Sequence, residues 1–347
     1  MYNKRKEVHN MKFDFPKVDL HFHLDGSMLP ELAWELAQER NLPMPADNLA
    51  DFREFIVLTS DCKSVYDYLE RFEMPLMILQ DAEALRRTTY EIIKHVAKQG
   101  LAYAEIRFAP QLHKQKGLSQ SDAVDAVLKG MKQATSEVSS IKIGIILCCM
   151  IAPDNTNRSE NMETVALAKK YHGKGVVGLD LAGPEGFVPM SEYAELFKDY
   201  HQEGFPLTIH AGDCDGPTSV NTALDFGPTR IGHGHHCYDD PKVTQRVIDN
   251  NITLEVCITS NIQCKTQPSF KEHPIKKLYD MGVRVTLNTD NMILSNTTLD
   301  KEYEIAMREL GFTYNDLIKM NIYSIEASFM PESEKGAYIE KLKSYLQ

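Results

Sequence analysis

The sequence predicts an α/β protein, more specifically a (β/α)8 TIM-type barrel with a helical insertion between strands 1 and 2 and extra C-terminal helices. Eight short apolar runs recur along the chain, and nearly all of them are separated by segments with helical periodicity. Most of these runs are apolar throughout rather than alternating, which is typical of parallel strands buried on both faces. Eight such units in a chain of 347 residues indicate one closed barrel, because barrels of this length routinely form a single domain.

The first ten residues, MYNKRKEVHN, are polar and charged, so we expect a flexible N-terminal lead over residues 1–14 and one domain over residues 15–347. The first strand is expected at Val18–His23. Pro30 suits the first turn of a helix that extends to Arg40. The stretch 47–99 is expected to hold several helices that cover the mouth of the barrel. One of them has an apolar face formed by Val65, Leu69, Phe72 and Leu76.

Beyond the insertion, strands and helices alternate regularly. The other seven strands are expected at Leu101–Phe108, Ile141–Ile151, Gly175–Leu181, Pro206–His210, Arg230–Gly232, Ile252–Cys257 and Val283–Leu287. The helices between and after them are expected at Ser119–Ala134, Ser159–Tyr171, Ser191–Glu203, Ser219–Phe226, Lys242–Asp249 and Pro274–Met281, with further helical segments from Leu299 onward.

Composition narrows the class of partner. The chain is 43% apolar, carries a net charge of −11 and has no extended basic run, which argues against nucleic acid or an anionic membrane as its main partner. No apolar run approaches the length of a bilayer span, and the N-terminus lacks the apolar core of a signal peptide. The seven cysteines are odd in number and form no CxxC pair, so we expect reduced thiols and a cytoplasmic protein, either a monomer or a weak homo-oligomer.

The clearest chemical signal is the pair His21 and His23 at the end of the first expected strand. Residues two apart in a strand project from the same face, so both imidazoles are presented to the same space. In a barrel, working residues collect at the C-terminal ends of the strands, where these two histidines lie. This HxH pair therefore predicts half of a metal site, which other strand ends would have to complete.

Three other strand ends supply the remaining groups: His210, His233 and Asp290. Imidazole nitrogens and a carboxylate oxygen are ligands that zinc accepts, and we expect one Zn²⁺ per chain, bound by His21, His23, His210 and Asp290, with an open position for water. Such a zinc ion acidifies its water and so produces a hydroxide nucleophile. His233 is expected to orient that hydroxide and stabilise charge during its attack.

A general acid is also needed, and Asp213 lies three residues after His210 on the same strand-end loop. The competing interpretation of Asp213 is an N-cap for the helix expected near Ser219. These residues together indicate metal-assisted hydrolysis without naming its substrate.

Seven segments carry a resemblance to a known family. In order and spacing, the chain from about residue 16 to its C-terminus resembles the adenosine deaminase family. The segments are KVDLHFHLDGS, VVGLDLAG, LTIHAGD, GP followed by SV, RIGHGHH, LEVCITSN and TLNTDN. This resemblance implies a zinc-dependent barrel that hydrolytically removes the 6-amino group of a purine nucleoside, with adenosine or 2′-deoxyadenosine converted to inosine or 2′-deoxyinosine plus ammonia.

The resemblance also implies roles for individual residues. The metal ligands match the set chosen from the residues alone, with His23 also near the substrate, and His233 matches the family's catalytic histidine. Asp25 matches a carboxylate near the ribose 5′ hydroxyl, and Gly183 matches a backbone donor to a purine ring nitrogen.

Two expected substrate contacts depart from the family pattern. The family has glutamate where Asp213 stands, and that glutamate protonates purine N1; aspartate is one methylene shorter. The family also has a second aspartate where Asn291 stands, although an asparagine N–H can still donate to N7. Three readings follow: an ordinary adenosine deaminase, a deaminase of a related 6-aminopurine compound, or a catalytically weak purine-binding relative. A general amidohydrolase acting on other C–N bonds is a further alternative.

Overall fold

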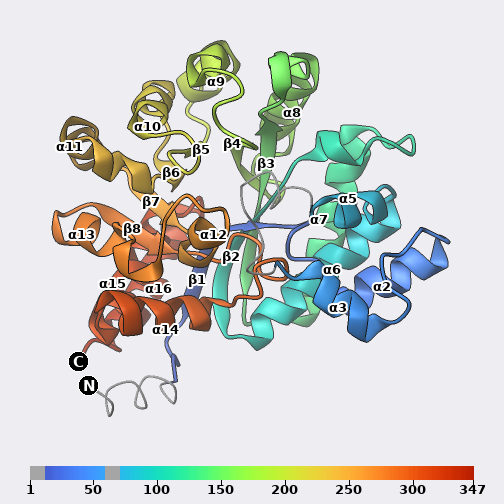
Figure 1. The fold of residues 1–347 in the computed structure, drawn as a ribbon, viewed down its shortest axis with the longest axis horizontal. Coiled ribbons are helices and arrows are strands. Elements are labelled where there is room, and N and C mark those ends of the chain that lie inside the picture. The colour runs from blue at the N-terminus through green and yellow to red at the C-terminus, as the bar shows by residue number, and fades with distance from the viewer. Residues whose placement is uncertain (1–11, 59–70) are drawn as a thin grey trace.

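The computed structural model describes residues 12–58 and 71–347, and its centre is a barrel of eight parallel strands (Figure 1). The strands pair in chain order as two four-stranded ladders, β1 to β4 and β5 to β8. This arrangement confirms the predicted fold class. The strands are β1 Lys17–His23, β2 Leu101–Phe108, β3 Lys142–Met150, β4 Val176–Ala182, β5 Thr208–Ala211, β6 Arg230–His233, β7 Thr253–Val256 and β8 Arg284–Leu287.

Backbone hydrogen bonds close the barrel at two places, where the two four-stranded ladders meet. Between β4 and β5, the N–H of Leu179 donates to the carbonyl of Pro206 at 3.1 Å. Between β1 and the residues after β8, the N–H of His23 donates to the carbonyl of Asp290 at 2.7 Å, and the N–H of Asp290 donates to the carbonyl of His21 at 2.8 Å. The second closure therefore uses three of the residues predicted to bind a metal.

Helices surround the strands, as Figure 1 shows. Between β1 and β2 lie α2 Pro30–Glu39, α3 Leu49–Ile56, α5 Glu73–Ile78 and α6 Ala82–Lys98, which confirms the helical insertion. The following units contain α7 Gln120–Glu137, α8 Arg158–Tyr171, α9 Ala194–Gln202, α10 Pro217–Ala223, α11 Pro241–Asp249, α12 Ile258–Gln263 and α13 Ile275–Asp280. The C-terminal helices are α14 Leu299–Leu310, α15 Tyr314–Ala327 and α16 Glu332–Lys343.

Local sequence explains where several helices begin. Ser119 and Asp122 form a reciprocal capping box at the start of α7, and Thr313 and Asp316 form another at the start of α15. In the insertion, Phe72 directly precedes α5, whereas Val65 and Leu69 of its predicted apolar face lie outside the described residues.

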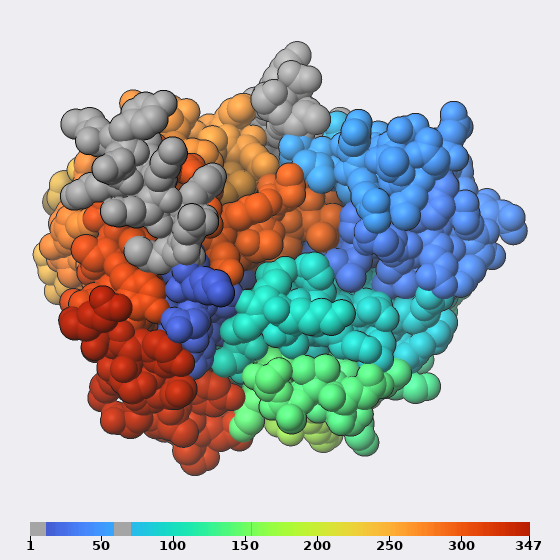
Figure 2. Space-filling view, turned by 90° about the horizontal axis from the view of Figure 1, so that it is seen from below, coloured from blue at the N-terminus to red at the C-terminus, as the bar shows by residue number. Residues whose placement is uncertain are grey.

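The first described residues pack against the C-terminal helices. The rings of Phe13 and Tyr303 have centroids 5.3 Å apart, and the ring of Phe15 contacts that of Tyr314 at 5.4 Å. Figure 2 shows this dark blue segment between the red C-terminal helices and the teal part of the chain. Phe13 is thus buried although it falls within the predicted flexible lead, of which residues 1–11 lie outside the described residues.

The barrel interior contains charged side chains as well as apolar ones. Arg230 on β6 contacts Glu255 on β7 at 2.6 Å, and Arg107 on β2 contacts the same carboxylate at 2.8 Å. Arg107 also contacts Asp180 on β4 at 3.0 Å, and Glu105 pairs with Arg230 from the other side. None of these five side chains is exposed, so a continuous ionic network runs through the interior beside the apolar side chains of strands that were predicted from their apolar runs.

Within residues 12–58 and 71–347, no helix combines the length and apolar character that a bilayer crossing needs.

Candidate metal and active site

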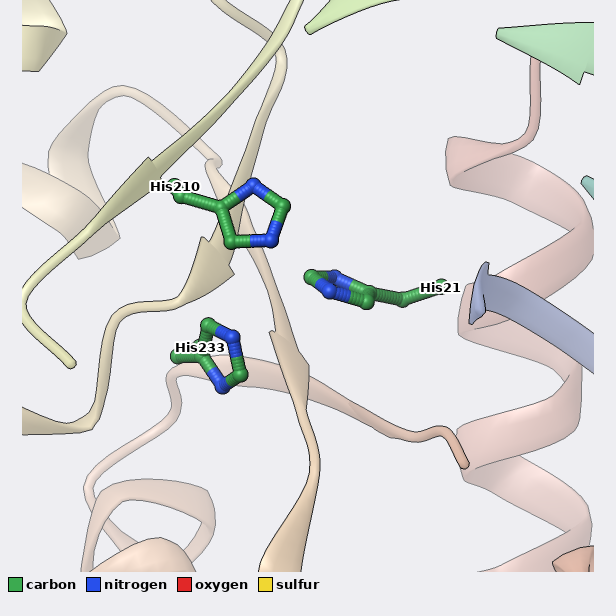
Figure 3. A group of neighbouring side chains, drawn as sticks. All are labelled: His21, His210 and His233. Carbon is green, nitrogen blue, oxygen red and sulfur yellow. The ribbon is translucent and has the colours of Figure 1, made fainter. Parts of the chain in front are cut away.

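The predicted chemical residues meet at the C-terminal mouth of the barrel. His21 and His23 end β1, His210 lies in β5, His233 ends β6, and Asp290 follows β8. Figure 3 shows the rings of His21, His210 and His233 turned toward a common space from three different strands. The geometry of parallel strands in a closed barrel is what brings side chains nearly 270 positions apart, such as His21 and Asp290, into reach.

Among the described residues, the donor atoms form two overlapping groups that share His21. His21, His23 and Asp290 make one group, and His21, His210 and His233 make the other; within each group the donor atoms lie within 4.8 Å of one another. The Oδ1 atom of Asp290 is 3.4 Å from Nε2 of His23 and 3.7 Å from Nε2 of His21. The predicted ligands are thus divided between two groups, with His210 joined to the rest through its neighbour His21.

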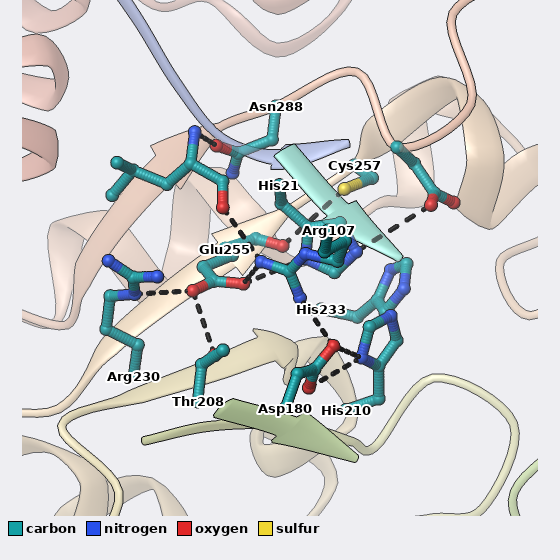
Figure 4. A network of polar contacts seen from close by, with 12 residues as sticks. His21, Arg107, Asp180, Thr208, His210, Arg230, His233, Glu255, Cys257 and Asn288 are labelled. Carbon is teal, nitrogen blue, oxygen red and sulfur yellow. Dashed lines mark hydrogen bonds and ion pairs between the residues drawn. The ribbon is translucent and has the colours of Figure 1, made fainter. Parts of the chain in front are cut away.

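Buried carboxylates contact Nδ1 of two of these histidines and so orient their rings (Figure 4). Nδ1 of His21 lies 2.8 Å from Glu255, and Nδ1 of His210 lies 3.0 Å from Asp180. A ring whose Nδ1–H is donated to a carboxylate has Nε2 free to bind a metal. Nε2 of His21 is buried without a hydrogen-bond partner among the described residues. A buried ring nitrogen in that state fits a metal ligand, because leaving it unsatisfied is otherwise costly.

Burial also controls the protonation of the ligands. Loss of hydration lowers the pKa of His21 and His23 well below the ordinary value, and the neighbouring positive groups act in the same direction. Both rings are therefore neutral near pH 7, the form that binds a metal. Burial also lowers the pKa of His210, but the charge of Asp180 and its hydrogen bond outweigh this and hold it above the ordinary value.

The backbone is strained at two of the site residues. His233 has φ of 59° and Asp290 has φ of 57°, both in the left-handed region that non-glycine residues rarely adopt. Beside them, Gly232 is needed for space, since a Cβ there would lie 3.0 Å from Cε1 of His21. The chain thus takes a locally unfavourable conformation to direct His233 and Asp290 into the mouth.

The predicted general acid, Asp213, is held by one side chain from α12 and one from the segment after it. Its Oδ1 accepts hydrogen bonds from Nδ2 of Asn261 at 2.8 Å and from Oγ1 of Thr266 at 2.9 Å. It is also 3.9 Å from Nδ1 of His233. The alternative reading of Asp213 as an N-cap is wrong, because α10 begins after Gly216 and has no side-chain cap.

Glu185 fixes the backbone of the same loop. Its carboxylate accepts from the N–H of Gly212 at 2.8 Å, the N–H of Asp213 at 2.9 Å and the hydroxyl of Ser219 at 2.6 Å. With the N–H of Cys214 at 3.3 Å, four donors converge on this carboxylate, so hydrogen bonds fix the backbone that carries the Asp213 side chain.

The expected substrate contacts surround a cavity of about 260 Å³ beside the histidines. Its walls include Asp25, Gly183 and Asn291, together with apolar side chains from the insertion and from β3. Burial raises the pKa of Asp25 to about 6. Gly183 has φ of 114° and so is required by the backbone conformation, whereas Gly26 is required for space, because a Cβ there would overlap the side chain of Asn291.

Sequence reasoning missed the residues that support the site. Asp180, Glu255 and Arg107 lie within strands that are predicted from their apolar neighbours, and the sequence pattern assigns no role to Asn261 or Glu185. A signal was present: a charged residue within a strand buried on both faces needs a partner, since an unpaired buried charge is very costly. The sequence alone does not show which of these charges pair with the histidines.

Fold and site together define a class of protein, the barrel hydrolases that gather histidine and carboxylate donors for a metal at one mouth. The model of the adenosine deaminase family matches residues 16–345. A similar protein is an adenosine deaminase from Haemophilus ducreyi, 40% identical over 94% of this chain and 95% of that protein. The chain belongs to the adenosine deaminase family and is a hydrolase that acts on a cyclic amidine.

Two solved structures share the fold. An N6-mAMP deaminase from Arabidopsis has a TM-score of 0.82 and 26% identity, with 98% of this chain and 99% of that chain covered. An amidohydrolase from Burkholderia ambifaria with bound Zn has a TM-score of 0.85 and 23% identity, with 99% of this chain and 93% of that chain covered.

Proposed function

We propose that this protein catalyses the zinc-dependent hydrolytic deamination of adenosine and 2′-deoxyadenosine, releasing ammonia and inosine or 2′-deoxyinosine. The observation that carries this proposal is the meeting of two histidine groups at His21, directly beside a cavity that also presents Asp213. The full-length similarity to an adenosine deaminase supports the same reaction.

His21, His23, His210 and Asp290 would hold one Zn²⁺ per chain. The buried, unpartnered Nε2 of His21 supports this assignment, as does the zinc in a barrel of similar fold. When bound, zinc lowers the pKa of a coordinated water toward neutrality and so supplies a nucleophile.

The chain's own residues would position the substrate and move the protons. His233 is placed to hydrogen-bond the attacking oxygen and to stabilise the charge that develops there. Asp213 would deliver a proton to N1 of the purine as C6 is attacked, and the N–H of Gly183 would hold another ring nitrogen. Asp25 would accept from the ribose 5′ hydroxyl, while Asn291 would donate its amide N–H to N7.

The charge of the cavity favours a nucleoside over a nucleotide. Among the described residues that line it there is no lysine or arginine, whereas Asp25, Glu185 and Asp213 contribute carboxyl groups. A phosphate group is normally held by arginine, lysine or a helix N-terminus, and it would be repelled by the ionised carboxyl groups of Asp25 and Glu185. The preferred substrate is therefore uncharged at the 5′ position.

A second candidate is the deamination of a related 6-aminopurine. This reaction is favoured by the short side chain of Asp213, because hydrogen bonds from Asn261 and Thr266 fix its Oδ1. A ring that lies deeper than that of adenosine would meet this carboxyl group better. A purine-binding protein with weak turnover is the remaining reading.

A panel assay on protein of measured zinc content tests the proposal. Adenosine, 2′-deoxyadenosine, adenine, AMP and N6-methyl-AMP are compared by ammonia release and by the change in purine absorbance. We expect the two nucleosides to have the highest kcat/KM. Faster turnover of adenine or of either nucleotide would move the assignment to the second candidate, and no turnover with tight purine binding would favour the binding protein.

We also propose a cytoplasmic protein that is a monomer or a weak homo-oligomer. Each of the six described cysteines is free, which suits a reducing compartment. The large exposed apolar side chains among the described residues are separated in the sequence by at least 25 positions, at Phe55, Met162, Phe187, Met281 and Leu346.

A further inference from the structure

Asn261 connects the two residues to which the mechanism assigns proton chemistry. It lies in α12, directly after β7, and its side chain is fully buried. Its Nδ2 is 2.8 Å from Oδ1 of Asp213 and 3.1 Å from Nδ1 of His233. Its Oδ1 is 3.1 Å from Nε2 of His273. One amide group thus has a polar partner on every side.

His273 determines which way that amide faces. The backbone N–H of Ile275 lies 3.2 Å from Nδ1 of His273 and can only donate, so this Nδ1 must carry no proton. Burial lowers the pKa of His273 to about 3, so its ring is neutral and its single proton is on Nε2. That N–H requires an acceptor, which is Oδ1 of Asn261. The NH₂ group of Asn261 therefore faces Asp213 and His233.

The orientation of the amide fixes the tautomer of His233. One N–H of Asn261 goes to the carboxylate of Asp213, and the other reaches Nδ1 of His233, which must accept. A neutral His233 ring then carries its proton on Nε2. Figure 3 shows one ring nitrogen of His233 turned toward the rings of His21 and His210, and the other nitrogen turned away. A nitrogen that carries a proton donates a hydrogen bond and cannot bind a metal.

We propose that Asn261, oriented by His273, is a positioning residue that keeps Nδ1 of His233 an acceptor and Nε2–H a donor toward the mouth, while it holds the carboxylate of Asp213 in place. His233 is thereby kept out of the metal-ligand set, although it lies as close to His21 and His210 as a ligand would. The expected effect of Asn261 on the rate of deamination rests on the proposed function. The assignment of the His233 tautomer does not.

The kinetic test compares Asn261→Asp with Asn261→Ala in the zinc-loaded enzyme. A carboxylate at position 261 can only accept, so it forces a proton onto Nδ1 of His233 and repels Asp213. We expect kcat for adenosine to fall about 100-fold in Asn261→Asp and about 10-fold in Asn261→Ala, as for other residues that orient a reacting group. KM and bound zinc should stay within about twofold of the parent values. Unchanged kcat in both variants would overturn the proposal.

A matched pair at position 273 tests the orienting bond. In His273→Gln, the amide N–H can take the place of Nε2–H, so kcat should stay within about threefold, whereas His273→Phe has no donor and should lose about 10-fold. Asn321→Ala is the control, because Asn321 is a buried asparagine that bonds the N–H of Val18 far from the mouth. It should lower Tm and leave kcat unchanged. Equal losses in the two position-273 variants would contradict the proposal.

A spectroscopic experiment tests the tautomer of His233 without any measurement of activity. Two-bond ¹H–¹⁵N spectra of zinc-loaded, histidine-labelled protein at pH 8 report which ring nitrogen carries the proton, and the His233 signals are identified by their loss in His233→Gln. We expect the Nε2–H pattern in the parent protein and its loss in Asn261→Asp. An Nδ1–H pattern in the parent would overturn the inference even if adenosine were turned over. The expected pattern in a protein without turnover would instead leave the inference standing and remove the proposed function.

Discussion

At the scale of single residues, three of the imidazoles at the mouth of the barrel, those of His21, His210 and His233, each have a polar partner at Nδ1. Carboxylates face Nδ1 of His21 and of His210, which directs Nε2 of both rings to the common space. Behind His233 there is an amide instead of a carboxylate. This difference separates rings suited to bind a metal from a ring suited to donate a hydrogen bond.

Removal of Asp290 should release the metal. In Asp290→Ala, the site keeps only neutral imidazoles, so we expect zinc affinity to fall about 100-fold and deamination to be lost. Elemental analysis after dialysis against a weak chelator measures the zinc. The comparison variant is His233→Ala, which should retain zinc and lose about 10²- to 10³-fold in kcat. Stoichiometric zinc in Asp290→Ala, or zinc loss in His233→Ala, would show that the ligand set is wrong.

Lengthening Asp213 should increase turnover of adenosine. One additional methylene moves the carboxyl group toward the cavity, and a misplacement of about 1 Å can cost about 100-fold in rate, so Asp213→Glu should raise kcat by about 10-fold or more. Steady-state kinetics on adenosine provide the measurement, with Asp213→Asn as the inactive reference. A fall in kcat for the longer acid would mean that Asn261 and Thr266 already place the aspartate correctly.

At the scale of elements, α6 and α7 pack in unusually close contact. Gly130 in α7 lies against the backbone of α6, where a Cβ would overlap the carbonyl oxygen of Arg86. Gly336 in α16 has open space on that side. The two helical glycines therefore differ in their reason for being glycine, since only the first is required by packing.

Alanine at these two positions should have opposite effects on stability. Gly130→Ala must push α6 and α7 apart, and we expect the free energy of unfolding to fall by about 2 kcal/mol. Gly336→Ala adds helix propensity at no steric cost and should raise that free energy by about 0.5–1 kcal/mol. Urea denaturation measures both. A stabilised Gly130→Ala protein would show that the two helices are less tightly packed than described.

Elements with strong periodicity could be predicted from the sequence, and supporting contacts could not. The strand that carries His21 and His23 follows from an apolar run and a period of two, and the observed β1 begins one residue earlier than expected. Helix α12 has six residues and continues directly from β7, so it lacks the length and punctuation that mark a helix. Because Asn261 lies in this helix, its role could not be predicted from the sequence pattern either. Partners such as Glu255 and His21 are far apart in the chain, and no local pattern specifies their pairing.

At the scale of the whole molecule, the charged interior links the two ends of the barrel. The network begins at Glu105, whose carboxylate accepts from the N–H of Phe329 in the C-terminal segment, and ends at His21 and His210 in the mouth. Arg230 and Arg107 stand between its carboxylates. An unbroken chain of ion pairs and hydrogen bonds thus connects the C-terminal segment with the histidines of the mouth.

Breaking this network should destabilise the entire fold. Arg230→Met leaves Glu105 and Glu255 buried without one guanidinium partner, so we expect a loss of about 3–5 kcal/mol in the free energy of unfolding. The contrasting variant is Arg53→Met, which removes a largely exposed ion pair with Glu31 and should cost less than about 1 kcal/mol. Chemical denaturation compares the two. Similar costs would mean that the interior charges contribute no more than surface ones.

The closure of the barrel through His21, His23 and Asp290 has a consequence for shortened chains. Two of the proposed metal donors lie in β1, and the backbone segment that completes both the barrel and the donor set lies nearly 270 positions later in the chain. A chain that stops before Asp290 therefore lacks the only carboxylate of the proposed donor set and the last seam of the barrel together. We therefore expect a chain cut before Asp290 to bind zinc weakly and to lose the ordered mouth at the same time, because one backbone segment serves both purposes.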